Sequence, residues 1–189
     1  MKNLEIYIHI PFCVRKCEYC DFLSFPADDD AKLRYVKGLM AEMIIYGPLM
    51  KNYQVSSVYI GGGTPSSIDE QWIAALMEGV FDCFNVLPDA EISIECNPGT
   101  LSREKLLAYR DAGINRLSIG LQSANNDELK LLGRIHTFEQ FVTNYEVARN
   151  VGFKNINVDL MYGLPGQSAS QYMATVNKII RLHPDHIYQ

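Results

Sequence analysis

The chain has 189 residues, of which 48% are hydrophobic, and a formal net charge of −5 at pH 7. This length and composition suffice for one domain with a full hydrophobic core, and we expect no membrane span and no low-complexity tail. The negative charge argues against nucleic acid as the main partner and favours a small-molecule ligand.

The first predicted strand, Glu5–Ile10, leads into three closely spaced cysteines, Cys13, Cys17 and Cys20. Three thiolates in a short loop suit an iron–sulfur cluster, in which each cysteine binds one iron and a fourth iron stays open to a small molecule. Arg15 and Lys16 lie between the first two cysteines, where their positive charge offsets the negative charge of a thiolate cluster. The spacing therefore predicts a reactive metal centre.

Other interpretations of the cysteines remain open. His9, four residues before Cys13, would complete a Cys3His zinc site. A disulfide is less favoured, because the chain has five cysteines and three of them lie within eight residues, which is typical of metal ligands in a reducing cytosol. We therefore expect a cytoplasmic protein. Cys83 and Cys96 lie in an apolar helical stretch and at a strand end, and we expect both to be small buried side chains.

The rest of the chain alternates short β-rich runs with longer amphipathic segments. Each β-rich run is apolar and β-branched enough to lie in a sheet buried on both faces. After Glu5–Ile10 the predicted strands are Val55–Ile60, Glu91–Glu95, Arg116–Gly120 and Asn157–Met161, with a sixth beginning near His186. The predicted helices, several opened by a capping Asp or Ser, are Asp30–Tyr46, Asp69–Phe84, Ser102–Ala112, Phe138–Val151 and Ser168–Leu182. Successive βα units of this kind form either a (β/α) barrel or a doubly wound parallel sheet.

Unusual residues lie at or just after the ends of the first five predicted strands. The first strand leads into the cysteines; the next four lead into Gly61-Gly62-Gly63-Thr64-Pro65, Glu95-Cys96-Asn97-Pro98, Gln122, and Asp159 followed by Gly163-Leu164-Pro165-Gly166. Because the carboxyl ends of parallel strands meet at one edge, these residues are expected to surround a single pocket.

Each of these residues also has an ordinary structural interpretation. The glycines would form a tight turn, and they match neither a phosphate loop nor a dinucleotide fingerprint. Arg134 and Asp159 would form a buried ion pair, since a charge in an apolar segment needs a partner. His136 is expected to be a surface or capping residue.

The aromatic residues around the cysteines are also open to two interpretations. Tyr7, Tyr19 and Phe22 flank the cysteine motif. They are interpreted either as core aromatics or as walls that exclude water from a reactive centre.

Several longer strings of residues resemble one known family. Together, the cysteine motif, the glycine turn and the later rim residues resemble the radical S-adenosylmethionine (SAM) superfamily over nearly the whole chain. More narrowly, the resemblance is to the oxygen-independent coproporphyrinogen III oxidase family and its haem-chaperone (HemW-type) branch. The strings that carry it are Tyr7-Ile8-His9-Ile10-Pro11-Phe12-Cys13, Asn115-Arg116-Leu117-Ser118-Ile119-Gly120, Leu132-Gly133-Arg134 and Asp159-Leu160-Met161-Tyr162-Gly163-Leu164-Pro165-Gly166.

The resemblance implies an α/β fold, a partial (β/α)6 radical SAM barrel, in which the cysteines hold a [4Fe-4S] cluster. SAM would bind the open iron, and an electron donor would drive its cleavage to a radical that abstracts hydrogen. By position, Tyr7 and Tyr19 would border the cluster and adenine, and Gly62, Gly63 and Thr64 would meet the methionyl amino end. The remaining implied contacts, to the ribose and carboxylate of SAM, are Glu95, Gln122, Arg134 and Asp159.

Two departures favour the haem-chaperone branch within this family. The oxidases resemble CxxxCxxCxC, with a further cysteine after the cluster motif, whereas Cys20 is followed here by Asp21 and Phe22. The oxidases also carry an extension before the first strand, whereas the first strand is predicted here from Glu5. The expected function is therefore binding of haem and its delivery to client haemoproteins. The alternative is oxidative decarboxylation of coproporphyrinogen III in porphyrin biosynthesis. Residues 1–189 are expected to be one radical SAM core domain, truncated near the sixth strand, with the C-terminal remainder of the family's chain absent.

Overall fold

The computed structural model describes residues 2–189, which contain one six-stranded sheet. The strands pair in the order of the chain, and every neighbouring pair is parallel. Sequential parallel pairing requires a crossover after each strand, and helices provide these crossovers. The strands are β1 (Lys2–Ile10), β2 (Tyr53–Gly62), β3 (Val86–Cys96), β4 (Arg116–Gln122), β5 (Asn155–Leu160) and β6 (His186–Tyr188).

The five predicted helices are confirmed, and their starts are set by side-chain caps. The helices are α1 (Asp29–Tyr46), α2 (Glu70–Cys83), α3 (Arg103–Asp111), α5 (Phe138–Asn150) and α6 (Ala169–Ile180). Asp28, Asp69 and Ser102 accept main-chain N–H groups at the first turns of α1, α2 and α3. Thr137 and Ser168 form capping boxes at α5 and α6.

One helix and three single turns were not predicted. Helix α4 (Asn126–Leu131) follows β4 and begins at the Asn125 cap. The 3-10 turns are η1 (Gly47–Met50), η2 (Pro65–Ser67) and η3 (Pro98–Thr100), each with proline in its first turn. Such short segments lack the long apolar periodicity by which helices are recognised in a sequence.

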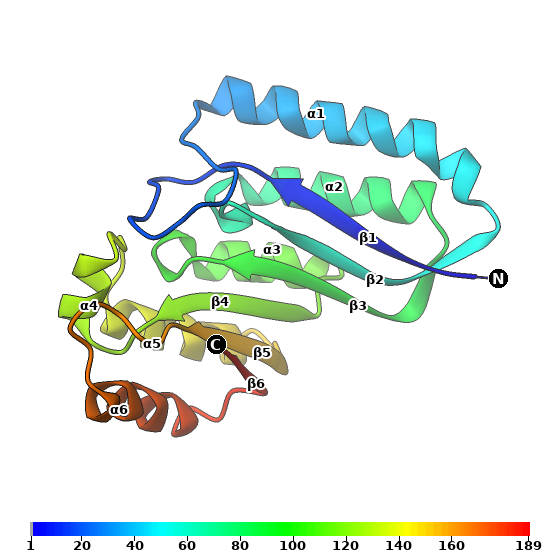
Figure 1. Ribbon diagram of the computed structural model, residues 1–189. Helices are drawn as coiled ribbons and strands as arrows, with labels where there is room; N and C mark the ends of the chain where they lie inside the picture. The colour runs from blue at the N-terminus through cyan, green and yellow to red at the C-terminus, as the bar shows by residue number, and fades with distance from the viewer. Residues whose placement is uncertain (1) are drawn as a thin grey trace.

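The sheet is not apolar on both faces as predicted, although Ser93, Ser118 and Asn157 on the inner face of its central strands are buried. Figure 1 shows an open, curved sheet with the helices along one side. Residues pointing toward the helices are apolar and buried; examples are Ile92 and Ile94 of β3 and Leu117 of β4. The opposite, inner face carries polar residues at alternate positions. They are Glu5, Tyr7 and His9 in β1, Ser57 and Tyr59 in β2, Glu91, Ser93 and Glu95 in β3, Arg116 and Ser118 in β4, and Asn155, Asn157 and Asp159 in β5.

The carboxyl ends of β1 to β5 lie together at one edge of the sheet, where the loop from Pro11 to Asp28 also lies (Figure 1). This loop, which we call the cysteine loop, is tied to the end of α4 by a hydrogen bond from Glu18 N–H to Leu132 O at 3.1 Å. Along residues 2–189, no helix is both long and apolar enough to cross a membrane.

Candidate functional site

A cavity of about 150 Å³ lies at this carboxyl edge of the sheet. The cysteine loop forms one wall, and the ends of β2, β3, β4 and β5 form the others. Its lining residues are Cys13, Arg15, Cys17, Tyr19, Cys20, Phe22, Gly62, Gly63, Thr64, Glu95, Cys96, Asn97, Ser118, Gly120, Gln122, Arg134 and Asp159. The structure thus brings all the residues predicted to bind the cluster or SAM, except Tyr7, to one place, whereas the segment Gly163-Leu164-Pro165-Gly166 does not line the cavity.

The cysteine loop is held in shape by its main chain. Cys13 N–H donates to Phe25 O at 3.2 Å, and Phe25 N–H donates to Pro11 O at 3.0 Å, so both ends of the loop are joined. Cys20 N–H donates to Cys17 O at 3.1 Å, which folds the second half into a turn. All three thiols are free and line the cavity. The loop therefore presents three soft sulfur ligands on one side, the donor set that iron–sulfur clusters use.

Gly63 allows Cys13 to lie against the end of β2. A Cβ atom at position 63 would be 2.8 Å from Phe12 O and 3.0 Å from Cys13 Sγ, closer than side-chain atoms pack. Thr64 Oγ1 lies 3.4 Å from Cys13 Sγ, and Thr64 N–H donates to Phe12 O at 2.8 Å. The glycine turn thus holds the first cysteine through main-chain contacts.

Arg134 enters the cavity from the segment after α4. Its Nη1 lies 3.7 Å from Cys17 Sγ and 3.3 Å from the Tyr19 hydroxyl, and its Nη2 donates to Gly120 O. The side chain therefore connects the cysteine loop with the end of β4, and it places a positive charge beside a sulfur ligand.

Glu95 is oriented by two donors at the end of β3. Its Oε1 accepts the Tyr59 hydroxyl at 2.9 Å, and its Oε2 accepts Gly62 N–H at 3.0 Å. Burial raises the pKa of Glu95 above its usual value, although these two hydrogen bonds oppose the shift. A carboxylate held in this way is preorganised to accept hydrogen bonds from hydroxyl groups.

Asp159 is held in a similar way at the end of β5. Asn157 Nδ2 donates to Asp159 Oδ1 at 2.6 Å, and the Ser118 hydroxyl donates to Oδ2 at 3.2 Å. Burial raises the pKa of Asp159 as well. The ordinary structural interpretation, an ion pair between Asp159 and Arg134, is not met: within residues 2–189 the pair does not form, and neutral donors hold the carboxylate instead.

Gln122 adopts a backbone conformation that is uncommon for a residue with a side chain. Its φ is 75°, and the pairing of β4 with β5 shifts register between Gly120 and Gln122. A Cβ at Gly120 would lie 3.1 Å from Gln122 Nε2 and 3.4 Å from Arg134 Nη2. Strain of this kind concentrates at functional sites, where the surrounding structure supports it.

Of the two interpretations of the aromatic residues, the structure excludes the core one, because 58%, 38% and 69% of the surfaces of Tyr7, Tyr19 and Phe22 are exposed. Tyr7 stacks on Tyr59 at a centroid distance of 6.1 Å and does not line the cavity. The prediction for His136 is wrong. His136 is neither a surface nor a capping residue, because it is only 3% exposed and its Nδ1 lies 3.1 Å from Asn97 Oδ1.

The geometry gives little support to a zinc site. The ring of His9 lies 3.1 Å from the Tyr7 hydroxyl through Nδ1 and 3.4 Å from Leu23 O through Nε2, and His9 does not line the cavity. Across residues 2–189, no group of three or more His, Cys, Asp and Glu side chains is placed to hold a single metal ion. An iron–sulfur cluster does not need such a group, because each of its cysteines binds a different iron. The other two cysteines differ from each other: Cys96 is buried at the cavity wall, as expected, whereas Cys83 is only half-buried.

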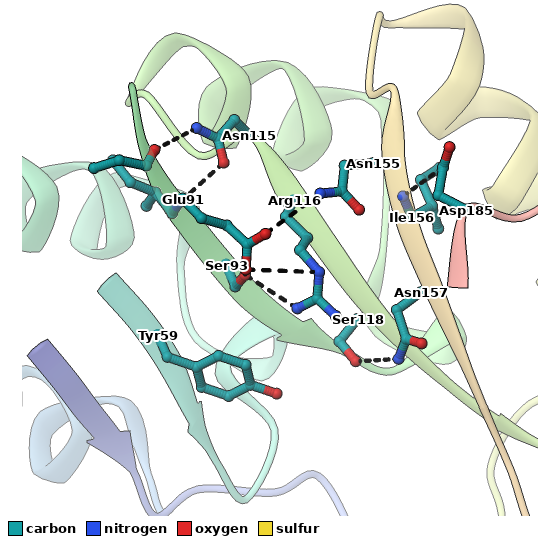
Figure 2. Close-up of polar contacts among 12 residues, drawn as sticks. Tyr59, Glu91, Ser93, Asn115, Arg116, Ser118, Asn155, Ile156, Asn157 and Asp185 are labelled. Atoms are coloured by element: carbon teal, nitrogen blue, oxygen red, sulfur yellow. Dashed lines mark hydrogen bonds and ion pairs between the residues drawn. The ribbon is translucent and has the colours of Figure 1, made fainter. Parts of the chain in front are cut away.

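A second cavity, of about 680 Å³, adjoins the first on the inner face of the sheet. Its walls include Tyr59, Arg116 and Asn157, and the two cavities share Tyr19, Phe22, Glu95, Ser118, Gln122 and Asp159. Figure 2 shows the polar side chains of this face: Arg116 Nη1 donates to Ser93 Oγ at 3.1 Å, and Asn157 Nδ2 donates to Ser118 Oγ at 2.9 Å.

Sequence reasoning missed these inner-face residues. The signal was present, because polar and apolar residues alternate through Glu91-Ile92-Ser93-Ile94-Glu95 and Arg116-Leu117-Ser118-Ile119-Gly120. Strict alternation indicates a strand with only one apolar face.

Comparison with known proteins gives one family match. The model of the radical SAM superfamily matches residues 7–179. The solved structure of coproporphyrinogen III oxidase (HemN) from Escherichia coli, a radical SAM enzyme, superposes with a TM-score of 0.91 at 33% identity. The match covers 100% of this chain and 44% of that one.

Curated relatives include the heme chaperone HemW of Escherichia coli, 38% identical over 97% of this chain and 49% of the relative. The heme chaperone HemW of Bacillus subtilis is also 38% identical, over 95% of this chain and 48% of the relative. The chain thus spans about half the length of the curated relatives that it matches.

Proposed function

The chain belongs to the radical SAM superfamily, and from this membership we propose that it is a haem-chaperone-type protein that carries a [4Fe-4S] cluster and binds SAM. Membership implies both cofactors, and the likeness to the oxidase structure confirms the expected partial barrel. The observation that carries the proposal is the convergence of three cysteines and the polar strand ends on one cavity.

The residues present fit the cluster. Cys13, Cys17 and Cys20 supply three thiolates from one short loop, and the absence of a side chain at Gly63 leaves room beside Cys13. Arg134 would offset part of the negative charge of the cluster, since it already lies beside Cys17. When bound and reduced, the cluster supplies the electron that cleaves SAM.

The chain's own residues would bind and orient SAM. Arg134 suits its carboxylate, because a guanidinium forms paired hydrogen bonds with that group. Glu95 and Asp159 are preoriented acceptors for ribose hydroxyls or an ammonium group, and Gln122 adds an amide between them. Gly62, Gly63 and Thr64 expose main-chain groups to the amino end. Tyr19 and Phe22 would limit water at the cavity wall.

Tyr7 has a less direct place in this proposal. Its hydroxyl lies 3.1 Å from His9 Nδ1, and its ring stacks on Tyr59, which in turn holds Glu95. We propose that Tyr7 borders the cluster and the adenine through this exposed inner face.

Haem handling is favoured by the curated relatives, which are named heme chaperones and are 38% identical to this chain. Phe22 also favours haem handling. It lines the cavity at the position where the motif that the oxidases resemble has a further cysteine. The alternative, coproporphyrinogen III oxidation, is favoured by the high structural similarity to the oxidase. Client haemoproteins and an electron donor would be the protein partners.

Anaerobic reconstitution with iron and sulfide tests the cofactor part of the proposal. We expect the unmodified protein to bind a cluster and Cys17→Ser to lose it, because two thiolates cannot hold three irons of the cluster. Cys83→Ser, on α2 and outside the cavity, should load normally. Iron and sulfide content and the visible absorption spectrum are the measurements, and a fully loaded Cys17→Ser variant would contradict the ligand assignment.

A functional assay then separates chaperone from oxidase. The loaded protein is given haem and an apo-haemoprotein in one reaction, and SAM, reductant and coproporphyrinogen III in another. Haem binding and transfer, without loss of the porphyrinogen, would support the chaperone function. Conversion of the porphyrinogen to protoporphyrinogen would instead assign the biosynthetic reaction.

A further inference from the structure

A buried polar network lies behind the cavity and connects loops that are distant in the sequence. Asn97 stands at its centre, after β3, and lines the cavity. Its main-chain N–H donates to Ser66 Oγ at 2.9 Å, and its Oδ1 accepts Gly99 N–H at 3.2 Å. Thr100 Oγ1 donates to Asn97 O at 2.9 Å and lies 2.6 Å from Ser66 Oγ.

The network reaches the glycine turn through Ser66. This residue is fully buried in η2, two residues after Thr64. Lys105 of α3 donates from Nζ to Ser66 O at 2.7 Å and to Ile68 O at 2.8 Å, which fixes the same turn from behind. Asn97 is therefore hydrogen-bonded to Ser66, which follows the turn that carries Gly62, Gly63 and Thr64.

His136 closes the network on the other side. Its Nδ1 lies 3.1 Å from Asn97 Oδ1, which already accepts Gly99 N–H, so Nδ1 carries the hydrogen and donates. The ring also contacts the main chain of Leu121, immediately before the strained Gln122. Burial, helped by the nearby Arg134, lowers the pKa of His136 to about 4. The ring is thus a neutral donor at physiological pH.

We infer that His136 is a positioning residue for the SAM site, which holds the β3 loop and the turn after β2 in register through its hydrogen bond to Asn97. The inference rests on the proposed function. His136 does not line the cavity and acts through its neighbours: Asn97 at the wall, Gln122 beside Leu121, and Arg134 two residues earlier in the chain.

Two variants with the same side-chain branching isolate the hydrogen bond. His136→Asn places an amide N–H near the position of Nδ1 and keeps a donor to Asn97, whereas His136→Leu has a similar shape and no donor. Both lose the same part of the ring, so their packing losses should match. Urea unfolding of the two variants checks this.

The main measurement is the equilibrium affinity of the cluster-loaded protein for SAM. In His136→Leu, Asn97 Oδ1 loses one of its two donors. The resulting shift of the binding loop should weaken SAM binding by about tenfold. His136→Asn should restore affinity to within about twofold of the unmodified protein. Cluster content should be unchanged in both, because the cysteines are intact. Equal SAM affinity in all three proteins, or an equal loss in both variants, would overturn the inference.

Amide hydrogen exchange of the metal-free protein separates this inference from the proposed function. Exchange in segments 64–67 and 97–100 should be faster in His136→Leu than in His136→Asn. If the unmodified protein loads no cluster or binds no SAM, the proposed function fails. Faster exchange in His136→Leu than in His136→Asn would still establish the structural link between His136 and segments 64–67 and 97–100. Identical exchange in the two variants would contradict the link itself.

Discussion

Single residues at the cavity trade folding stability for preorganisation. Glu95 and Asp159 are carboxylates whose pKa values are raised by burial, so their charged forms are disfavoured in the folded protein. Hydrogen bonds from Tyr59, Gly62, Asn157 and the Ser118 hydroxyl keep them in one orientation. Buried polar groups that are fully oriented before a ligand arrives are expected at binding sites and are a known cause of lower stability.

Glu95→Gln should therefore stabilise the fold and weaken SAM binding. At pH 7 we expect its free energy of unfolding to rise by about 0.5–2 kcal/mol. The pKa of Glu95 in the folded protein lies above the ordinary value of 4.5. The ionised carboxylate therefore destabilises the fold as the pH rises through the folded pKa, and this destabilisation is absent below about pH 4.5. Urea unfolding at pH 7 and pH 4 measures both effects.

The exposed Glu146 on α5 offers a matched control. Glu146→Gln should change the free energy of unfolding by less than about 0.5 kcal/mol at either pH. A Glu95→Gln variant that is less stable than the unmodified protein at pH 7 would show that the carboxylate is held favourably, contrary to the argument from burial.

At the scale of elements, close contacts between turns determine where the ligands lie. The end of β2 lies against the cysteine loop, and the segment after α4 contacts the same loop from the opposite side through Leu132 O. The left-handed Gly133, with φ of 72°, ends α4 and directs Arg134 toward Cys17. Small changes in these turns should therefore affect metal loading more than changes of similar size in the outer helices.

Two glycine substitutions test this difference. Gly63→Ala places a Cβ 2.8 Å from Phe12 O and 3.0 Å from Cys13 Sγ, so we expect a loss of about 1–3 kcal/mol in stability and a lower iron content. Gly38→Ala, inside α1 with nothing within 4 Å of the added Cβ, should gain about 0.5–1 kcal/mol. Urea unfolding and iron per chain are measured for both. Normal iron content in Gly63→Ala would show that the turn adapts.

At the scale of the whole molecule, the open sheet gives the protein one apolar and one polar face. The apolar face packs on the helices and provides the core, while the polar face and the strand ends form two adjoining cavities. Stability and ligand binding are thus carried by opposite sides of the same strands. Binding on the inner face should add to stability without rearrangement of the core.

SAM should accordingly stabilise the cluster-loaded protein more than the metal-free protein. With free SAM at 100 times its dissociation constant, we expect a gain of about 2.7 kcal/mol in the free energy of unfolding. The metal-free protein lacks the iron that SAM would bind, so its gain should be much smaller. Anaerobic thermal unfolding with and without SAM gives the comparison, and equal gains would argue against binding at the cluster.

Local patterns in the sequence were sufficient for the order of the six strands and the five longer helices, and for most of the residues that meet at the first cavity. The cysteine spacing, the capping residues Asp69, Ser102 and Ser168, and the residues after each strand could all be interpreted without the fold. These features depend on neighbours within a few residues along the chain. In a parallel sheet, strand ends also meet at one edge by topology alone, which is why a single pocket was predicted correctly.

Tertiary structure decided which side chains touch. Arg134 contacts Cys17 across 117 positions of sequence, and His136 contacts Asn97 across 39. His136 was expected to be a surface or capping residue, and this expectation is wrong. The alternative in which Arg134 pairs with Asp159 is not met either. The partner of a buried polar group depends on which donors the packed elements bring within hydrogen-bonding distance. The sequence by itself determined which residues meet at the rim and which cysteines are the candidate ligands, whereas long-range packing determined how each polar side chain is held there.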